Sequence, residues 1–316
     1  MVTRAFLKGK DDDLNMKKPT RLFITGGTGF VGRHLLPVLS QQGYQVRCLA
    51  RSATHKRLAS LPGVEWIEGD LTAANGWSQM LKGQDALIHL ASIHEGSPQL
   101  IRRINLTGTE NLVSAARFVQ IKRFVYLSTI TAVDNPKLHY SHSSWLAEKL
   151  IRERMEDFRI LRATLIVGPG DPFLGGLIHF ARHWPFIPII GSGQTKFQPL
   201  GVEDLVRCLV QALSEERYSQ RTIPIAGPET LSLEQIVDLL QKTLHTEKRK
   251  IHLPRRATRV LVSVLRQLHI HTQFTSAYFL KKGLITEAQS VEAQFGFLPQ
   301  SLAEILHSLV DPKSLT

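Results

Sequence analysis

The segment Thr25–Gly32 has the residue types and spacing of a phosphate-binding loop. Its sequence satisfies both the G-x-x-G-x-x-G and the G-x-G-x-x-G patterns. Glycines suit such a loop because the turn is tight and the backbone must approach a pyrophosphate closely. A helix that follows would direct its free N–H groups and the positive end of its dipole at the phosphates. Seven residues are therefore candidate dinucleotide ligands: Gly26, Gly27, Thr28, Gly29, Phe30, Val31 and Gly32. The alternative is a tight structural turn without a ligand.

Two arginines bear on which dinucleotide this loop would bind. In a loop of this kind the second strand usually ends at an Asp or Glu that accepts from the ribose 2′-hydroxyl of NAD. Here the strand ends Leu49-Ala50-Arg51-Ser52, without an acid. Arg51 can pair with a 2′-phosphate, and Arg33, directly after the last glycine, would add a second positive charge. We therefore favour NADP(H), with NAD(H) as the alternative. If neither arginine contacts the dinucleotide, each is a solvated charge at the end of a helix.

Alternating strands and helices are predicted around this loop, and they must position it. Apolar runs predict parallel strands at Arg21–Thr25, Gln45–Ala50, Val64–Glu68, Ala86–Leu90 and Arg123–Ser128, with helices such as Phe30–Leu39 and Leu100–Val119 between them. This alternation indicates an α/β fold with a doubly wound parallel Rossmann sheet. The right-handed crossover rule gives the strand order 3-2-1-4-5-6, with room for a seventh strand.

The pattern changes after Gly168, where prolines and glycines crowd together. We expect a dinucleotide-binding domain over residues 20–168 and a smaller, mostly helical C-terminal substrate lobe over residues 169–316. The sequence predicts a strand at Thr222–Ala226 between helices at Val202–Leu213 and Leu233–Leu244. We therefore expect some segments near residues 200–227 to return to the Rossmann core. Residues 1–19 contain three consecutive aspartates and lack an apolar signal region, so we expect a disordered leader, with Met16 as a second candidate start.

Composition narrows the class of protein. The longest apolar runs, such as Ala86–Ala91, are far shorter than the roughly 20 residues of a membrane-spanning helix. The two cysteines, Cys48 and Cys208, lie in apolar segments without C-x-x-C spacing, so neither a disulfide framework nor a metal site is expected. A reducing, cytoplasmic setting fits best.

The positive charge is concentrated in one window, Lys242–Lys282. Ten basic residues face one acidic residue there, which gives +9 of the net charge of +12. Such a window fits an anionic membrane surface, a larger protein complex or a solvated face. Nucleic acid is disfavoured because the window lacks interleaved aromatic residues and a known motif. A location at the inner face of a membrane would follow from the first of these partners.

Several segments together resemble the extended and atypical short-chain dehydrogenase/reductase superfamily, which includes NAD-dependent epimerase/dehydratase-like proteins. The resemblance covers about residues 21–227. Besides the glycine loop it rests on Gly69-Asp70-Leu71, Asp85–Ala91, Asn105–Leu112, Leu127-Ser128-Thr129 and Arg162–Gly170. It implies that Asp70 and Leu71 contact the adenine and that Ala91 lines the nicotinamide side. By the same resemblance Asn105 belongs to the cofactor-binding set and Thr129 takes the catalytic Ser/Thr position.

The family also has a Tyr-x-x-x-Lys pair, and this chain departs from it. Tyr140 fits the tyrosine position, but Ser144 takes the place of the lysine. A phenol with a pKa of about 10 needs a shift of roughly 3 units to act near neutral pH, and an ammonium about 4 Å away supplies about that much. Other cations could take the place of that lysine. Lys149 should face about 140° away from Ser144 on the helix, whereas His139 and His142 flank Tyr140 in the sequence and could assist it.

The C-terminal motifs around Ala226–Glu234 and Phe295-Gly296-Phe297 narrow the resemblance to an atypical branch. That branch includes the nucleotide-binding accessory subunit of respiratory complex I and its bacterial relatives. We therefore expect an NADP(H)-binding protein with weakened or absent dehydrogenase catalysis. The alternative is an active NADP-dependent oxidoreductase or sugar-nucleotide epimerase/dehydratase that uses Tyr140 and Thr129 on an unknown small-molecule substrate.

Overall fold

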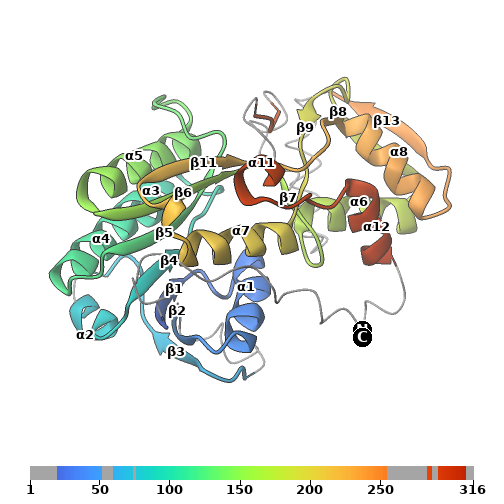
Figure 1. The fold of residues 1–316 in the computed structure, drawn as a ribbon. Coiled ribbons are helices and arrows are strands. Elements are labelled where there is room, and N and C mark those ends of the chain that lie inside the picture. The colour runs from blue at the N-terminus through green and yellow to red at the C-terminus, as the bar shows by residue number, and fades with distance from the viewer. Residues whose placement is uncertain (1–19, 52–59, 74–75, 255–282, 287–290, 311–316) are drawn as a thin grey trace.

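A seven-stranded parallel sheet forms the centre of the molecule (Figure 1). The computed structural model describes residues 20–51, 60–73, 76–254, 283–286 and 291–310. The order β3-β2-β1-β4-β5-β6-β11 confirms the predicted doubly wound topology and supplies the seventh strand. The strands are β1 (Arg21–Thr25), β2 (Gln45–Ala50), β3 (Val64–Glu68), β4 (Ala86–His89), β5 (Arg123–Thr129), β6 (Asp157–Ala163) and β11 (Arg221–Ile225).

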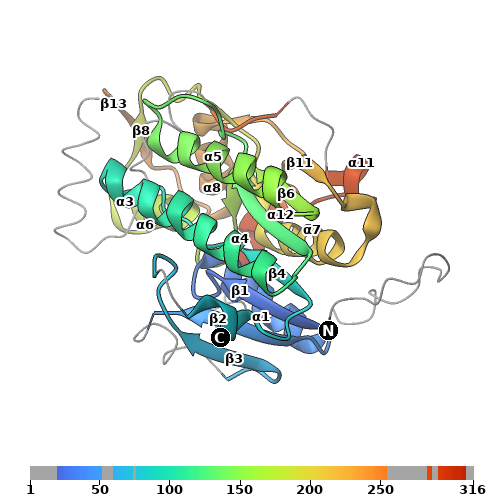
Figure 2. The ribbon, with the colours of Figure 1, turned by 90° about the vertical axis from the view of Figure 1, so that its left-hand side faces the viewer.

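Helices cover both faces of the sheet (Figure 2). On one face, α1 (Phe30–Gln41) and α7 (Val202–Ser214) pack against each other and bury their leucines on the strands. On the other face lie α2 (Trp77–Leu81), α4 (Gly108–Phe118) and α5 (His139–Arg154). The apolar residues of these helices recur every three or four positions, so each helix presents one apolar side to the sheet. The central strands β1 and β4 are accordingly buried on both sides.

One predicted helix is interrupted. In place of a single helix over Leu100–Val119, the chain forms α3 (Pro98–Arg102), a π-helix (Arg103–Thr107) and then α4. Asn105 lies in the π-helix with its side chain buried, and the Thr109 hydroxyl donates to the Asn105 carbonyl at 2.7 Å. A side chain thus satisfies a carbonyl where the helix widens. Such widened turns are frequent at functional sites.

The C-terminal lobe has its own apolar core. Ser232 caps α8, because its side chain accepts from the Gln235 N–H while the Gln235 side chain accepts from the Ser232 N–H. The lobe's helices are α6 (Pro172–His183), α8 (Leu233–Thr243) and α12 (Leu302–Val310). Two short elements lie near α7 instead, namely α11 (Val291–Phe295) and a 3₁₀ turn (Glu216–Tyr218). Short strand pairs join them: β8 (Phe186–Ile190) with β13 (Arg249–Leu253), β9 (Lys196–Phe197) with β12 (Leu231–Ser232), and β7 (Ile166–Val167) with β10 (Leu200–Gly201).

Buried charges hold the amino ends of β5 and β6 to the end of α7. Asp157 accepts from Arg123 at 2.7 Å and from Arg159 at 2.8 Å. The two guanidinium groups also donate to carbonyls of the last turn of α7, at Ala212 and Leu213. Burial alone would raise the pKa of Asp157, but the two arginines hold it below its ordinary value. This cluster lies at the edge of the sheet opposite the glycine loop, so it serves stability.

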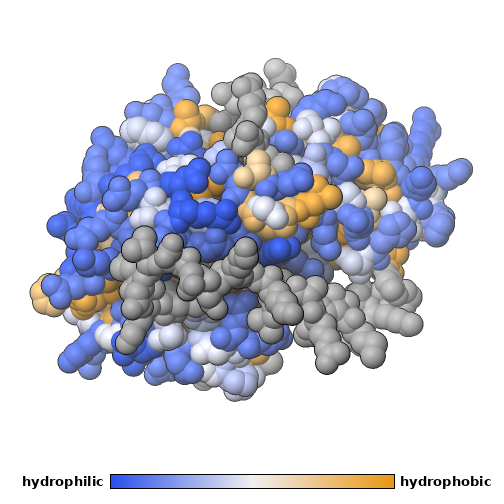
Figure 3. Space-filling model, viewed as in Figure 1, coloured by the Kyte–Doolittle hydropathy of each residue, from blue (hydrophilic) through white to orange (hydrophobic). Residues whose placement is uncertain are grey.

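The surface visible in Figure 3 is mostly hydrophilic, with apolar residues in small groups. Within the described ranges, no helix is both long and apolar enough to cross a bilayer. The expected leader and most of the basic window, residues 255–282, lie outside the described residues. The described part of that window, residues 242–254, includes the end of α8 and strand β13.

Candidate cofactor and substrate site

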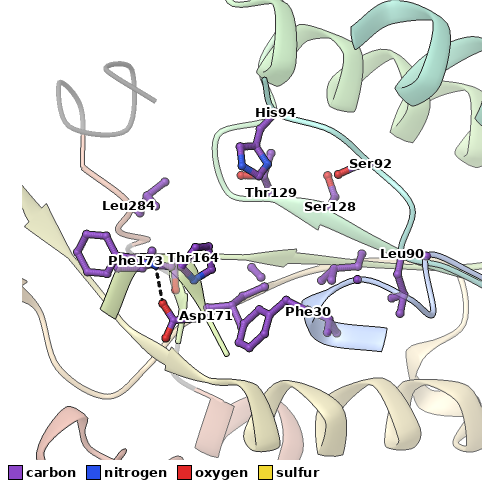
Figure 4. Close-up of a pocket in the computed structure, with 18 of the residues that line it drawn as sticks. Phe30, Leu90, Ser92, His94, Ser128, Thr129, Thr164, Asp171, Phe173 and Leu284 are labelled. Atoms are coloured by element: carbon purple, nitrogen blue, oxygen red, sulfur yellow. Dashed lines mark hydrogen bonds between the residues drawn. The ribbon is translucent and has the colours of Figure 1, made fainter. Parts of the chain in front are cut away.

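A cavity of about 410 Å³ opens at the carboxyl ends of β1, β4, β5 and β6 (Figure 4). This edge includes the point where the strand order reverses, the usual ligand site of doubly wound sheets. Five predicted loop residues and two predicted catalytic residues line it, namely Gly26, Gly29, Phe30, Val31, Gly32, Thr129 and Tyr140. Residues that were not predicted as site residues complete the lining, among them Leu90, Ser92, His94, Ser128, Thr164, Asp171, Phe173, Phe197 and Leu284.

The glycine loop is a cradle that side chains would fill. Gly26 has φ +80°, and a Cβ there would lie 2.6 Å from the Ala91 nitrogen. A Cβ at Gly32 would lie 2.4 Å from the Gly26 carbonyl oxygen. Helix α1 begins directly after Gly29, without a side-chain cap and without an acid in its first turn. The loop therefore fits a pyrophosphate, with the N-terminal N–H groups of α1 as its donors.

A buried polar chain fixes the strands below this cradle. His89 lies between Thr25 and Thr109, with ring nitrogen to hydroxyl distances of 2.6 Å and 2.9 Å. Burial lowers the pKa of His89 to about 3, so its imidazole is neutral at physiological pH. Its ring stacks on Tyr126 of β5 at a centroid distance of 5.3 Å. This histidine thereby ties β1, β4, β5 and α4 together.

Tyr140 and Thr129 meet in the cavity, whereas Ser144 lies behind it. The Ser144 hydroxyl is buried and donates to the Tyr140 carbonyl at 3.0 Å. Burial raises the pKa of the Tyr140 phenol, and hydrogen bonds with the side chains of Ser92, Thr129 and Ser144 offset only part of that rise. Tyr140 is therefore a neutral phenol at pH 7, suited to donating a hydrogen bond.

The ionisable residues next in sequence turn elsewhere. Lys149 is exposed, pairs with Glu153 at 3.9 Å and lies over the ring of Trp145, as its predicted position on the helix requires. His142 contacts Asp134 at 3.3 Å and stacks on Trp145. Neither side chain lines the cavity.

Glu148 supports the cavity wall from inside α5. Its fully buried carboxylate accepts from the Ser128 hydroxyl at 2.5 Å, from Arg162 at 2.6 Å and from Arg152 at 2.9 Å. Sequence reasoning assigned Glu148 no role, because its partners lie on β5 and β6 as well as on its own helix. The cluster fixes Ser128, the neighbour of Thr129, against the cavity.

Three of the predicted adenosine contacts, Arg51, Asp70 and Leu71, follow β2 and β3, whereas Arg33 lies in α1. Arg51 follows β2 and is exposed, whereas Arg33 donates to the Thr28 carbonyl at 2.9 Å. Hydrogen bonds from the Thr72 N–H and hydroxyl lower the pKa of Asp70, burial opposes this, and the charges of Arg103 and Arg51 add to it.

Arg103, in the π-helix, was not predicted as part of this group. Leu71 packs tightly on α4, since a Cβ at Gly108 would lie 2.6 Å from the Leu71 Cγ. Gly27 and Thr28 belong to the loop but do not line the cavity, and a Cβ at Gly27 would lie 2.2 Å from the Cys48 Sγ.

Asn105 and Ala91 lie behind the cavity wall rather than on it. The Asn105 side chain donates to the Ile93 carbonyl and accepts from the Ile93 N–H, both at 2.8 Å. It thereby holds the loop that carries Ser92 and His94. Ala91 lies against Gly26, where its backbone excludes any larger residue.

The far end of the cavity comes from the C-terminal lobe. Asp171 caps α6 by accepting from the N–H groups of Phe173 and Leu174, and burial raises its pKa to about 6. An Asp before a Pro at the start of an apolar stretch is a helix-start signal that could have been found. Phe197 and Leu284 come from segments far apart in sequence, bonded through Leu284 N–H to the Lys196 carbonyl at 3.0 Å. No local pattern signals them.

Comparison with curated proteins identifies several relatives. The chain is 25% identical over 223 residues to the mitochondrial NADH dehydrogenase (ubiquinone) 1 alpha subcomplex subunit 9 of Dictyostelium discoideum, covering 69% of this chain and 62% of that protein. It is 32% identical over 189 residues to a ceramide reductase of Caulobacter vibrioides, covering 59% of each. It is 24% identical over 294 residues to the photosystem II assembly factor Ycf39 of Synechocystis, covering 89% and 86%. The chain thus spans about 60% of the length of the first two relatives.

A solved structure shows the fold, and a family model shows the family. UDP-glucose 4-epimerase from Thermotoga maritima has a TM-score of 0.74 at 18% identity, covering 94% of this chain and 100% of that chain, which shows a common fold. The model of the NAD dependent epimerase/dehydratase family matches residues 22–226. The chain therefore belongs to the NAD-dependent epimerase/dehydratase family of nucleotide-binding proteins, as its resemblance to the extended short-chain dehydrogenases indicated.

Proposed function

We propose that this protein binds NADP(H) along the glycine loop and catalyses hydride transfer weakly or not at all. The observation that carries the proposal is Ser144, a buried hydroxyl one helical turn from Tyr140, at the position where the family has a lysine. The bound dinucleotide would supply hydride. Because burial raises the pKa of Tyr140, the phenol retains its proton and orients a ligand oxygen more readily than it exchanges a proton.

The preference for the 2′-phosphate rests on Arg51. It is exposed where β2 ends, and it lies near enough to Asp70 for its charge to lower the pKa of that carboxyl. Arg33 is held beside the loop by its bond to the Thr28 carbonyl. A guanidinium at the end of the second strand matches a 2′-phosphate, whereas an acid there would repel it.

Calorimetric titration with both dinucleotides tests this preference. Losing one charge-assisted bond costs about 1.5–3 kcal/mol, so Arg51→Ala should weaken NADPH binding by roughly 10- to 150-fold and leave NADH binding nearly unchanged. Arg47→Ala is the matched control, because Arg47 lies on β2, the strand that Arg51 follows, but pairs with Glu65 at 3.0 Å. Unchanged NADPH affinity in Arg51→Ala would remove the basis for the NADP(H) assignment.

A second candidate is an active NADP-dependent oxidoreductase or epimerase. It is favoured because Tyr140 and Thr129 line one cavity and hydrogen-bond to each other. The similarity to a ceramide reductase fits this candidate as well. Rapid NADPH oxidation with a carbonyl compound, abolished by Tyr140→Phe, would favour it over the binding protein. Rapid oxidation that survives Tyr140→Phe would contradict both assignments of Tyr140.

We also propose that the basic window Lys242–Lys282 attaches the protein to an anionic surface. The window carries +9, and each basic residue near an anionic membrane contributes about 1 kcal/mol. The relative in NADH dehydrogenase makes a protein complex the alternative partner. Flotation with anionic and neutral liposomes should recover the chain only with anionic lipid and at low salt. Equal recovery with both lipids, or none, would contradict membrane attachment.

A further inference from the structure

The end of the cavity opposite the glycine loop is apolar. Phe173 at the start of α6, Phe197 of β9 and Leu284 are buried side chains that line it. The two phenyl rings contact each other at a centroid distance of 6.0 Å. In Figure 4, Phe173 and Leu284 lie together at one end, and Phe30 and Leu90 lie at the other. A ligand that extends past Tyr140 toward α6 therefore meets aromatic and aliphatic surface.

The polar groups at this end are already engaged within the protein. The Thr164 hydroxyl donates to the Gln198 carbonyl at 2.6 Å. The Asp171 carboxylate accepts from the N–H groups of Gly168, Phe173 and Leu174 at 3.0, 2.9 and 2.8 Å. The N-terminus of α6, which would otherwise attract an anion, is thus filled by the protein's own carboxylate.

The lining residues that the structure describes also bear on the charge of the ligand. No residue that lines this cavity, within the described part of the chain, is a lysine or an arginine. A nucleoside diphosphate would bring its negative charges against phenyl rings and an acid. Burial of unpaired charge is costly. Such a ligand would therefore lose more hydration free energy than its contacts with this end of the cavity would return.

We propose that the second ligand of this site is an uncharged carbonyl compound with an apolar chain or ring, and not a sugar nucleotide. Its oxygen accepts hydrogen bonds from the hydroxyls of Thr129 and Tyr140. Its apolar part lies against Phe173, Phe197 and Leu284. This assignment rests on the proposed function, because it takes the glycine-loop end of the same cavity as the dinucleotide site.

Calorimetry on the full chain saturated with NADPH tests the assignment, with methyl octyl ketone and UDP-glucose as probes. The ketone should bind and UDP-glucose should not. Phe173→Ser should weaken ketone binding about tenfold, which is about 1.4 kcal/mol. Phe173→Leu, which keeps an apolar side chain in case the serine variant fails to fold, should retain binding within about threefold. Phe118→Ser is the control, because Phe118 is 76% exposed at the end of α4.

The outcomes separate this inference from the proposed function. Failure of NADPH to bind the wild-type chain contradicts the proposed function. With NADPH bound, tighter binding of UDP-glucose than of the ketone overturns the substrate class. Absence of ketone binding, or ketone binding that a folded Phe173→Ser variant leaves unchanged, overturns it too.

Discussion

Ser144→Lys should lower the pKa of Tyr140 and thereby reveal what this chain lacks. An ammonium about 4 Å from the phenolate, at an effective dielectric constant near 20, would contribute about 4 kcal/mol, or roughly 3 pKa units. Two features reduce that contribution of the ammonium to the pKa. Position 144 is 2% exposed, so the new ammonium loses hydration, and Glu148 lies one turn further along α5 as a competing partner. We expect a fall of at least about one unit.

Tyrosinate absorbance, followed during a pH titration, measures this directly and needs no substrate. Ser144→Met is the matched control, because methionine has a similar length and no charge. The chain has five tyrosines, so Tyr140→Phe in the Ser144→Lys background identifies the shifted group by removing it. Equal titration curves for the lysine and methionine variants would refute the view that residue 144 controls the acidity of Tyr140.

Three further predictions concern the loop, the buried charges and pH. Gly26→Ala places an alanine at φ +80°, which costs the loop conformation about 1–2 kcal/mol. Calorimetry should show NADPH binding weakened at least about tenfold. Gly175→Ala, with open space around it, should leave NADPH binding unchanged. Arg159→Leu leaves a buried acid without one partner and should lower the free energy of unfolding in urea by about 3–5 kcal/mol, whereas Arg217→Leu, at an exposed pair, should cost under about 1 kcal/mol. Burial raises the pKa of Asp171 from 3.8 to about 6, so the folded state holds this proton at higher pH than the unfolded state does. The contribution of Asp171 to the free energy of unfolding, up to about 3 kcal/mol, is complete below about pH 4 and is lost as the pH rises through about 6. Urea unfolding at about pH 4 and about pH 7 measures this difference, and Asp171→Asn should flatten it. An identical pH dependence in both proteins would contradict the assignment.

The sheet and the glycine cradle were predictable because their signals are local. The predicted strand Arg21–Thr25 matches β1 residue for residue, and Gln45–Ala50 matches β2, since each is a short apolar run bounded by loop residues. Parallel strands bring their carboxyl ends to one edge, so Thr129 and the loop had to lie near each other. The Lys149 orientation followed from helix geometry alone.

The remainder of the site depends on contacts between distant segments. Leu284 reaches the cavity by pairing with β9, and Glu148 reaches Arg162 across α5 and β6. The π-helix at Arg103–Thr107 was missed because the apolar spacing of that stretch also fits one continuous helix. Asn105, which we expected among the cofactor ligands, also donates from its side chain to the Ile93 carbonyl, a contact that no local pattern signals. Such tertiary pairings leave no period in the sequence.

A crystal structure of the chain with NADPH tests the central claim most directly. The proposal predicts the pyrophosphate over Gly26–Gly32 and the N-terminus of α1, with the 2′-phosphate beside Arg51. It also predicts the nicotinamide facing Tyr140 and Thr129, with the Ser144 hydroxyl, rather than a cation, on the side of the nicotinamide ribose. A cationic side chain beside that ribose would contradict the proposal, as would a dinucleotide bound away from the glycine loop.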